Sequence, residues 1–225
     1  MGPDRYLPFL PAILNWIQQT LDAYAREKRA VSSFKLPRLP YYFSEGLLSM
    51  ACVVPTDRLP VPPLSALGLT EFADFENQPM SGITYKETYF LQRSAAATDE
   101  SLHFHELVHI VQWHVLGPKD FLLQYAIGLN EQGYLGCPLE AMAYEHQRRF
   151  DAGEPSYSVE AEVREQTLAL KTYAANWARL GDSPGQTKEP ALVGSAYKVH
   201  TPIVTYPQKR RISRPRWDVN TRRTK

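Results

Sequence analysis

The residues whose types and spacing suggest chemistry most clearly are His105, Glu106 and His109, which form the pattern His-Glu-x-x-His. Two histidines four residues apart on a helix differ by about 40° in direction and by about 6 Å in height. Both imidazoles therefore lean over one spot, as two ligands of one metal ion do. In this pattern the histidines bind Zn²⁺ and the glutamate acts as general base on a water molecule. The pattern predicts zinc-dependent hydrolysis with Glu106 as the catalytic base.

A helix must hold these residues, and the flanking sequence predicts one that begins near Asp99 and ends before Gly117-Pro118. Thr98 and Asp99 are favourable N-cap residues, and an acidic first turn complements the helix dipole. Apolar residues flank the helix face that carries His105 and His109, which predicts a buried helix. The alternative is a pair of ordinary histidines beside an apolar face. Glu106 in register between them favours the metal.

A catalytic zinc ion takes three protein ligands and keeps one position open, so a third ligand must lie outside the pattern. His103 and His114 are unsuitable, because they lie about 200° and about 180° around the helix from His105. Glu131 falls in a predicted loop. Glu145 stays open as the second choice.

Glu140 is the best candidate for the third ligand. It lies in the first turn of a helix predicted over residues 138–150, and the small Ala141 and Ala143 permit close approach. The alternative role for Glu140 is an acid that only complements the helix dipole. We therefore predict a metal site of His105, His109 and Glu140.

The sequence His-Glu-Leu-Val-His, followed downstream by a helix that carries Glu140, resembles the gluzincin class of zinc metallopeptidases. It is similar to minimal gluzincins, in which His-Glu-Leu-Val-His-x-x-Gln precedes Pro-Leu-Glu-x-x-Ala-Tyr. Here Gln112 and the segment 138–144 occupy those places. The resemblance covers residues 82–150. It implies a bound zinc ion and a peptide or protein substrate.

The chain departs from the gluzincin pattern at one position. Gluzincins commonly carry an acid four residues after the glutamate ligand, where it orients a histidine ligand, but this chain has Tyr144 there. Either Tyr144 or Glu145 takes that part, or the site is less well ordered. The donor that would stabilise a developing oxyanion also stays open, and the sequence does not rank the candidates. These candidates are Tyr125, Tyr134 and His146.

The hydrophobic patterning predicts an α+β fold that is mostly helical, a small zincin-like domain with a short β-sheet beside the metal-binding helix. The predicted helices span residues 10–30, 99–116, 119–129, 138–150 and 159–180, and the predicted strands span 49–54 and 82–91. The free edge of the second strand could pair with an extended peptide. Closing the sheet is an equally good role for that strand.

Length and composition suit a soluble protein with one domain, which we place at residues 1–184. The net charge of +1 favours no particular partner, and no apolar run is long enough to span a membrane. Two cysteines and no recognisable signal peptide favour the cytoplasm. Residues 185–225 form a basic tail, which we expect to be flexible and solvated. Nucleic acid is a less favoured partner for it.

Two functions from different classes fit these observations. One is a zinc metallopeptidase that hydrolyses peptide bonds. The other is a non-catalytic scaffold or binding protein that zinc only stabilises. A structural zinc site needs no general base between its ligands, so the presence of Glu106 favours the peptidase.

Overall fold

Helices enclose a small sheet in the computed structural model, which describes the backbone of residues 3–96 and 98–181 and side chains as far as residue 171. The elements in chain order are η1 (Pro3–Phe9), α1 (Leu10–Ala23), β1 (Arg29–Ala30), η2 (Val31–Ser33), η3 (Leu39–Tyr41), α2 (Glu45–Met50), β2 (Cys52–Thr56), η4 (Thr70–Phe72), α3 (Ala73–Glu76), β3 (Gly82–Tyr85), β4 (Thr88–Gln92), α4 (Glu100–Gly136), α5 (Pro138–Asp151) and α6 (Val159–Gly181). The prediction of a mostly helical α+β fold is confirmed.

The sheet has the strand order β1-β2-β4-β3. Strand β2 runs parallel to β4, whereas β1 and β3 run antiparallel to their neighbours. The prediction of one strand over residues 82–91 is wrong, because the chain reverses at Lys86 and Glu87 to form a hairpin. Lys86 adopts a φ of 54° in that turn. Glycine or asparagine usually occupies such a position, so the sequence carries no turn signal there.

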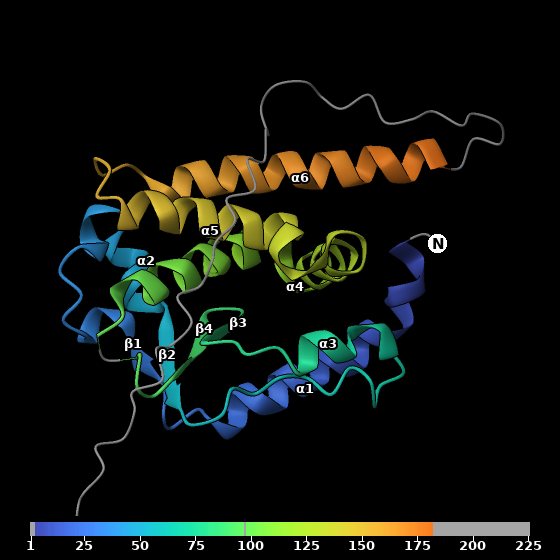
Figure 1. Cartoon of the computed structure of the whole chain (residues 1–225), viewed down its shortest axis with the longest axis horizontal. Helices are drawn as coiled ribbons and strands as arrows, with labels where there is room; N and C mark the ends of the chain where they lie inside the picture. Colours follow the sequence, from blue (N-terminus) through green and yellow to red (C-terminus); the bar gives the residue numbers. More distant parts are fainter. Residues whose placement is uncertain (1–2, 97, 182–225) are drawn as a thin grey trace, which may run out of the picture. The chain divides into compact units, whose positions relative to one another are not determined.

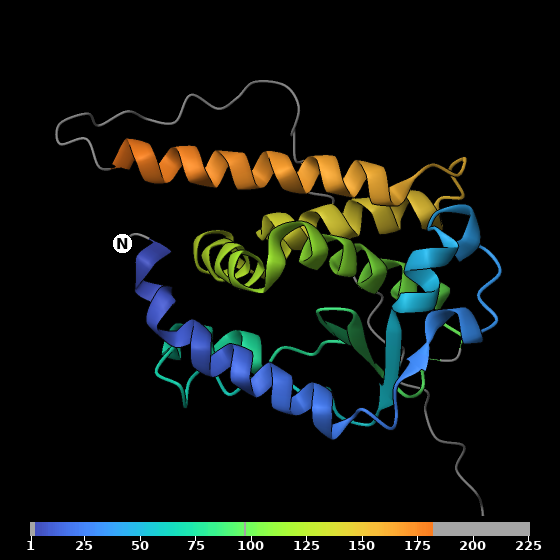
Figure 2. The same ribbon diagram turned by 180° about the vertical axis from the view of Figure 1, so that it is seen from behind.

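The two faces of the sheet belong to two hydrophobic clusters, and α4 and α1 lie on opposite sides of the sheet (Figures 1 and 2). Val53 and Tyr89 join the cluster that includes apolar residues of α4, α5 and α6. Val54 and Phe90, the next residues along each strand, join the cluster that includes α1. This alternation follows from the two-residue period of a strand, and it buries the sheet on both faces.

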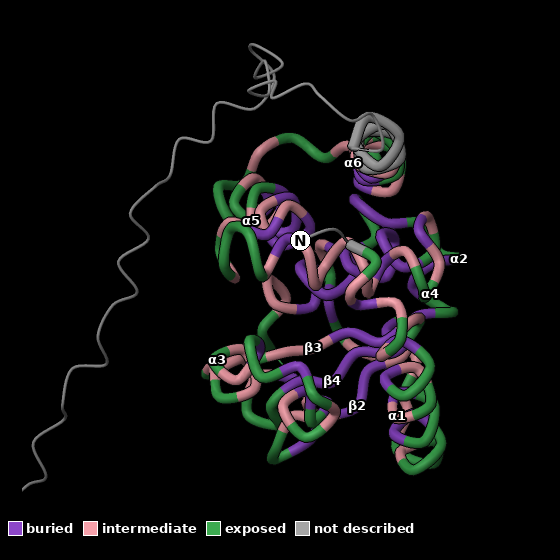
Figure 3. Tube along the Cα trace, turned by 90° about the vertical axis from the view of Figure 1, so that its right-hand side faces the viewer, coloured by how far each residue is buried: buried purple, intermediate pink, exposed green. Residues whose placement is uncertain are grey.

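Helix α4 runs through the middle of the fold, and its residues from His103 to Trp113 are all buried (Figure 3). It changes direction at Gly117, whose φ of 73° lies outside the helical region, immediately before Pro118. The expected break at this point is confirmed. The predicted extent of the loop over residues 130–136 is wrong, because α4 continues to Gly136 and is interrupted only by a kink at Gly133, whose φ is 71°.

The remaining helices follow the predicted pattern with shifted ends. Helix α1 ends at Ala23 rather than near residue 30, and the segment 49–54 is divided between α2 and β2. Helix α6 begins after Ser158, as expected. The domain limit at residue 184 and the basic tail lie outside the described residues. Within the described part of the chain, no helix is long and apolar enough to cross a membrane.

Candidate metal centre

The three predicted ligands meet at one point between α4 and α5. The Nε2 atoms of His105 and His109 are 3.1 Å apart. The carboxylate of Glu140 lies 3.4 Å from the first and 3.3 Å from the second. Ligand atoms at about 2.0–2.1 Å from a tetrahedral zinc ion lie about 3.3 Å from each other. These spacings therefore match the edges of a metal-coordination tetrahedron, and the buried group could hold a metal ion.

Two glutamines fix which nitrogen of each imidazole faces the centre. His105 Nδ1 lies 3.0 Å from Gln147 Oε1, and His109 Nδ1 lies 2.8 Å from Gln112 Oε1. Each amide nitrogen donates elsewhere, to Ser101 Oγ and to the carbonyl of Leu139, so each amide presents its oxygen to the ring. Both Nδ1 atoms must then donate. The lone pairs of both Nε2 atoms are left facing the centre.

Glu140 places a buried negative charge beside those lone pairs. Its Oε1 accepts a hydrogen bond from Tyr125 at 2.6 Å, while its Oε2 is buried without a hydrogen bond. Burial raises the pKa of Glu140, but the two histidines lower it by more, so the net shift is downward. Burial lowers the pKa of His109, but Glu140 raises it by more, to about 9. The arrangement thus needs a cation, which either a proton or a metal ion can supply.

Glu106 lies beside the ligands and is held from the opposite side by β3. Thr84 Oγ1 donates to Glu106 Oε2 at 2.6 Å. Gly82 leaves room for the other oxygen, because a Cβ at this position would collide with Glu106 Oε1. Burial raises the pKa of Glu106, and the two histidines lower it in part, so the net shift is upward. A carboxylate with a raised pKa is well suited to accept a proton.

The other ligand candidates lie elsewhere. Glu145 is exposed and pairs with Arg148 at 2.7 Å. Glu131 is exposed on the second segment of α4 rather than in a loop. His103 and His114 point away from the centre, toward Tyr89 and Glu87.

At the departure from the gluzincin pattern, the hydrogen bond to His105 comes from Gln147, which the sequence did not single out, and not from Tyr144 or Glu145. The Tyr144 ring lies against His105, with centroids 4.6 Å apart, while Gln147 makes the hydrogen bond expected of the missing acid. Gln147 follows Glu140 by seven residues, about two turns, so both project from one face of α5. That spacing is the signal that could have revealed it.

The structure also separates the three candidates for oxyanion donor. Tyr125 is engaged with Glu140, and His146 is engaged with Tyr157 and Gln166 away from the centre. Tyr134 lines the same pocket as the ligands, and its hydroxyl is hydrogen-bonded to Tyr144 rather than to a ligand. Burial, followed by the charge of Glu140, raises its pKa, so its hydroxyl stays protonated. Tyr134 is therefore the candidate best placed to donate a hydrogen bond.

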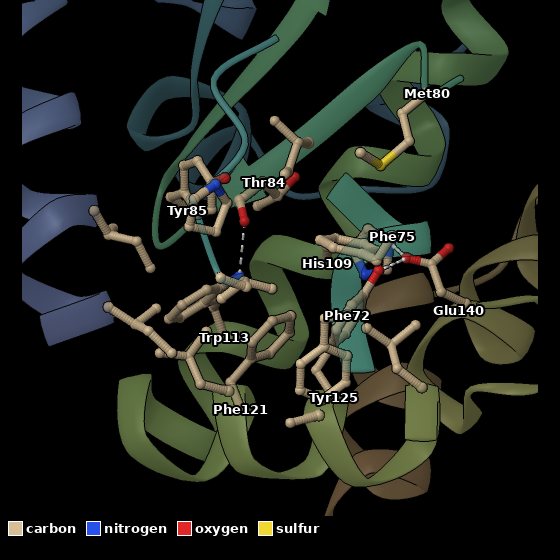
Figure 4. Close-up of a pocket in the computed structure, with 18 of the residues that line it drawn as sticks. Phe72, Phe75, Met80, Thr84, Tyr85, His109, Trp113, Phe121, Tyr125 and Glu140 are labelled. Atoms are coloured by element: carbon tan, nitrogen blue, oxygen red, sulfur yellow. Dashed lines mark hydrogen bonds and ion pairs between the residues drawn. The ribbon is translucent and has the colours of Figure 1, made fainter. Parts of the chain in front are cut away.

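A deep pocket adjoins the centre (Figure 4). Most of its wall is apolar and comes from α1, the η4–α3 segment, β3 and both segments of α4. His105, Glu106, His109 and Glu140 also line it, so the centre faces this mostly apolar pocket.

No protein-family model matches the chain, and comparisons with curated proteins and with solved structures find no match.

Proposed function

We propose that the protein is a zinc-dependent metallopeptidase that hydrolyses peptide bonds. The observation that carries this proposal is the position of Glu106 beside His105, His109 and Glu140, all facing one pocket. Each of these four residues is at most 5% exposed, so their charges act in a medium of low polarity.

The donor set supports zinc among the common metals. Two imidazole nitrogens and one carboxylate are ligands that zinc takes in hydrolytic enzymes, whereas Mg²⁺ and Ca²⁺ prefer oxygen donors. Among the described residues, no fourth histidine, cysteine or acid joins the group. Three protein ligands leave one position for a water molecule or a substrate.

The chain's own residues supply the proton transfers. A bound zinc ion would lower the pKa of water to about 7 and polarise the scissile carbonyl. Glu106 would take a proton at its free Oε1 and pass it to the leaving amine, while Thr84 holds Oε2. Tyr134 would donate to the carbonyl oxygen as negative charge develops there.

The non-catalytic alternative explains fewer of these features. A structural zinc site has no need of a buried carboxylate that is hydrogen-bonded beside its ligands, or of a pocket that reaches them. Both cysteines are free thiols, which suits the cytoplasm as the proposed compartment.

The deciding experiment replaces Glu106 with glutamine, which keeps the side-chain shape but removes its basicity. Zinc content and melting temperature should stay near those of the unaltered protein, because Glu106 is not one of the three ligands. Hydrolysis of a mixed peptide library, followed by mass spectrometry, should fall by about 10²–10⁴-fold.

Two controls frame this result. His105→Ala should abolish tight zinc binding together with cleavage. If the unaltered protein and Glu106→Gln gave the same cleavage products at the same rate, the peptidase proposal would be refuted. Zinc binding that stabilises the fold without any hydrolysis would support the scaffold.

A further inference from the structure

The pocket beside the metal centre is longer than one amino-acid side chain requires. Its lining on the part of α4 before Gly117 runs from His105 to Trp113, which is about 12 Å along a helix. Its lining on α1 runs from Leu10 to Ile17, about another 10 Å of wall. The space not filled by atoms is ≈ 900 Å³, including the part open to solvent.

The polar groups along this pocket already have partners within the protein. Trp113 Nε1 donates to the carbonyl of Thr84, and the Tyr85 hydroxyl donates to the carbonyl of Pro60. Tyr125 and the Thr84 hydroxyl are engaged with the two buried glutamates. A peptide main chain inside the pocket would leave its own N–H and C=O groups unpaired, at about 1–3 kcal/mol each. An occupant without internal hydrogen-bonding groups avoids that cost.

The edge of β3 also limits how a peptide substrate could bind beside the pocket. Trp113 occupies the Thr84 carbonyl, so an added peptide strand would not find that acceptor free. At Thr84, β3 is therefore better suited to closing the sheet than to pairing with a substrate strand.

Charge is confined to one end of the pocket. His105, Glu106, His109 and Glu140 lie together, and the remaining wall carries no other acid or base besides tyrosine hydroxyls. Figure 4 shows Glu140 and His109 on one side and Tyr85 and Trp113 on the other. The pocket thus complements a molecule with one polar end and one long apolar part.

We propose that this pocket binds an unbranched acyl chain, and that the substrate is a peptide or amine whose nitrogen carries that chain. This inference rests on the proposed function of the metal centre. The amide carbonyl would lie at the centre, and the chain would extend between α1 and α4. Water would supply its hydroxyl to the acyl carbon and a proton to the nitrogen as the C–N bond breaks, which yields a fatty acid and a free amine.

Binding tests the pocket separately from catalysis. The probes are N-acylglycinamides with acyl chains of increasing length, and calorimetry measures their binding to the full-length Glu106→Gln protein, which should not hydrolyse them. Each added methylene should tighten binding by about fourfold until the pocket is filled. N-acetyltryptophanamide, which offers one large side chain instead, should bind more weakly than the longest acyl probes.

Two variants fill the pocket from opposite walls. Ala126→Phe on α4 and Met80→Trp before β3 should each abolish the dependence on chain length, because both side chains line the pocket. Leu135→Phe is the matched control, since Leu135 is 62% exposed and does not line the pocket. This variant should bind the series as the unaltered protein does. Circular dichroism verifies that each variant is folded.

The outcomes distinguish this inference from the peptidase proposal. Affinity that is independent of chain length, or chain-length dependence that survives in a folded pocket-filling variant, would overturn the acyl pocket. Tighter binding of the tryptophan probe would overturn it too and would indicate an apolar peptide side chain as the occupant. Acyl binding without hydrolysis of N-acyl peptides by the unaltered protein would uphold the pocket and overturn the N-acyl substrate, and the peptide library would then decide the peptidase proposal by itself.

Discussion

Gly82 lies against the carboxylate of Glu106, the proposed general base, and Gly82→Ala tests whether this glycine sets the position of that carboxylate. A Cβ added at residue 82 would lie 2.8 Å from Glu106 Cδ and 2.8 Å from Leu91 Cδ2, and it would collide with Glu106 Oε1. Carbon atoms in contact normally lie about 3.5–4.0 Å apart, so the carboxylate must retreat by about 1 Å. Thr84 holds the other oxygen from the same strand, so moving β3 would displace that hydrogen bond as well.

The expected magnitude follows from this displacement. A shift of about 1 Å in a reacting group can lower the rate by about 10²-fold. Overpacking in a buried site costs about 1–3 kcal/mol of folding free energy. Zinc affinity should change little, because the nearest atoms to the added Cβ belong to Glu106 and Leu91 and not to a ligand.

The assay compares kcat/KM, zinc content by mass spectrometry and melting temperature for Gly82→Ala and for Gly46→Ala. Gly46 is a matched control, since its added Cβ would meet only Ser44 Oγ at 3.8 Å. An alanine within α2 should stabilise the protein slightly and leave kcat/KM unchanged. Full activity of Gly82→Ala at normal zinc content would refute the idea that this glycine sets the position of Glu106.

The other predictions concern the groups around the centre. Gln147→Leu and Gln112→Leu should each weaken zinc binding by about 10–100-fold in competition with a chromogenic chelator, whereas equal affinity would contradict the orienting role. Tyr134→Phe should lower kcat by about 10²–10³-fold at normal zinc content, and an unchanged kcat would exclude it as oxyanion donor. Burial lowers the pKa of His146 below 6.5, so below that pH the unfolded chain binds the proton first and the free energy of unfolding falls. In urea denaturation, His146→Gln should make the free energy of unfolding less dependent on pH between pH 7 and 5. The same pH dependence in the variant and the unaltered protein would contradict the role given to His146.

The sequence predicted the parts of the centre that depend on local spacing. His105 and His109 share a face because they are four residues apart on one helix, and that relation needs no tertiary information. Glu140 could be predicted for a similar reason, since Pro138 marks the start of its helix and places Glu140 in the first turn. Their meeting at one point depends on the packing of α4 against α5, which the sequence only suggested.

Other features could not be predicted, either because the local residue preferences give no signal for them or because distant segments create them. The hairpin between β3 and β4 has Lys86 at its turn, where local preference gives no signal. Glycines at residues 133 and 136 suggested a loop, but the segment is helical on both sides of a kink at Gly133. The pocket beside the centre is lined by residues of α1, α3, β3 and α4 among others, so no single stretch of sequence reveals it.

The neutral partners of the histidines have an electrostatic explanation. A zinc ion carries two positive charges, which the ionised carboxylates of Glu106 and Glu140 would balance. An acid in place of Tyr144, beside His105, would add a third buried negative charge, and burial of an unbalanced charge is costly. Gln147 and Gln112 orient the imidazoles through their amide oxygens without adding charge. In a centre that faces an apolar pocket, amides can therefore replace the usual acid without losing control of the ligand tautomers.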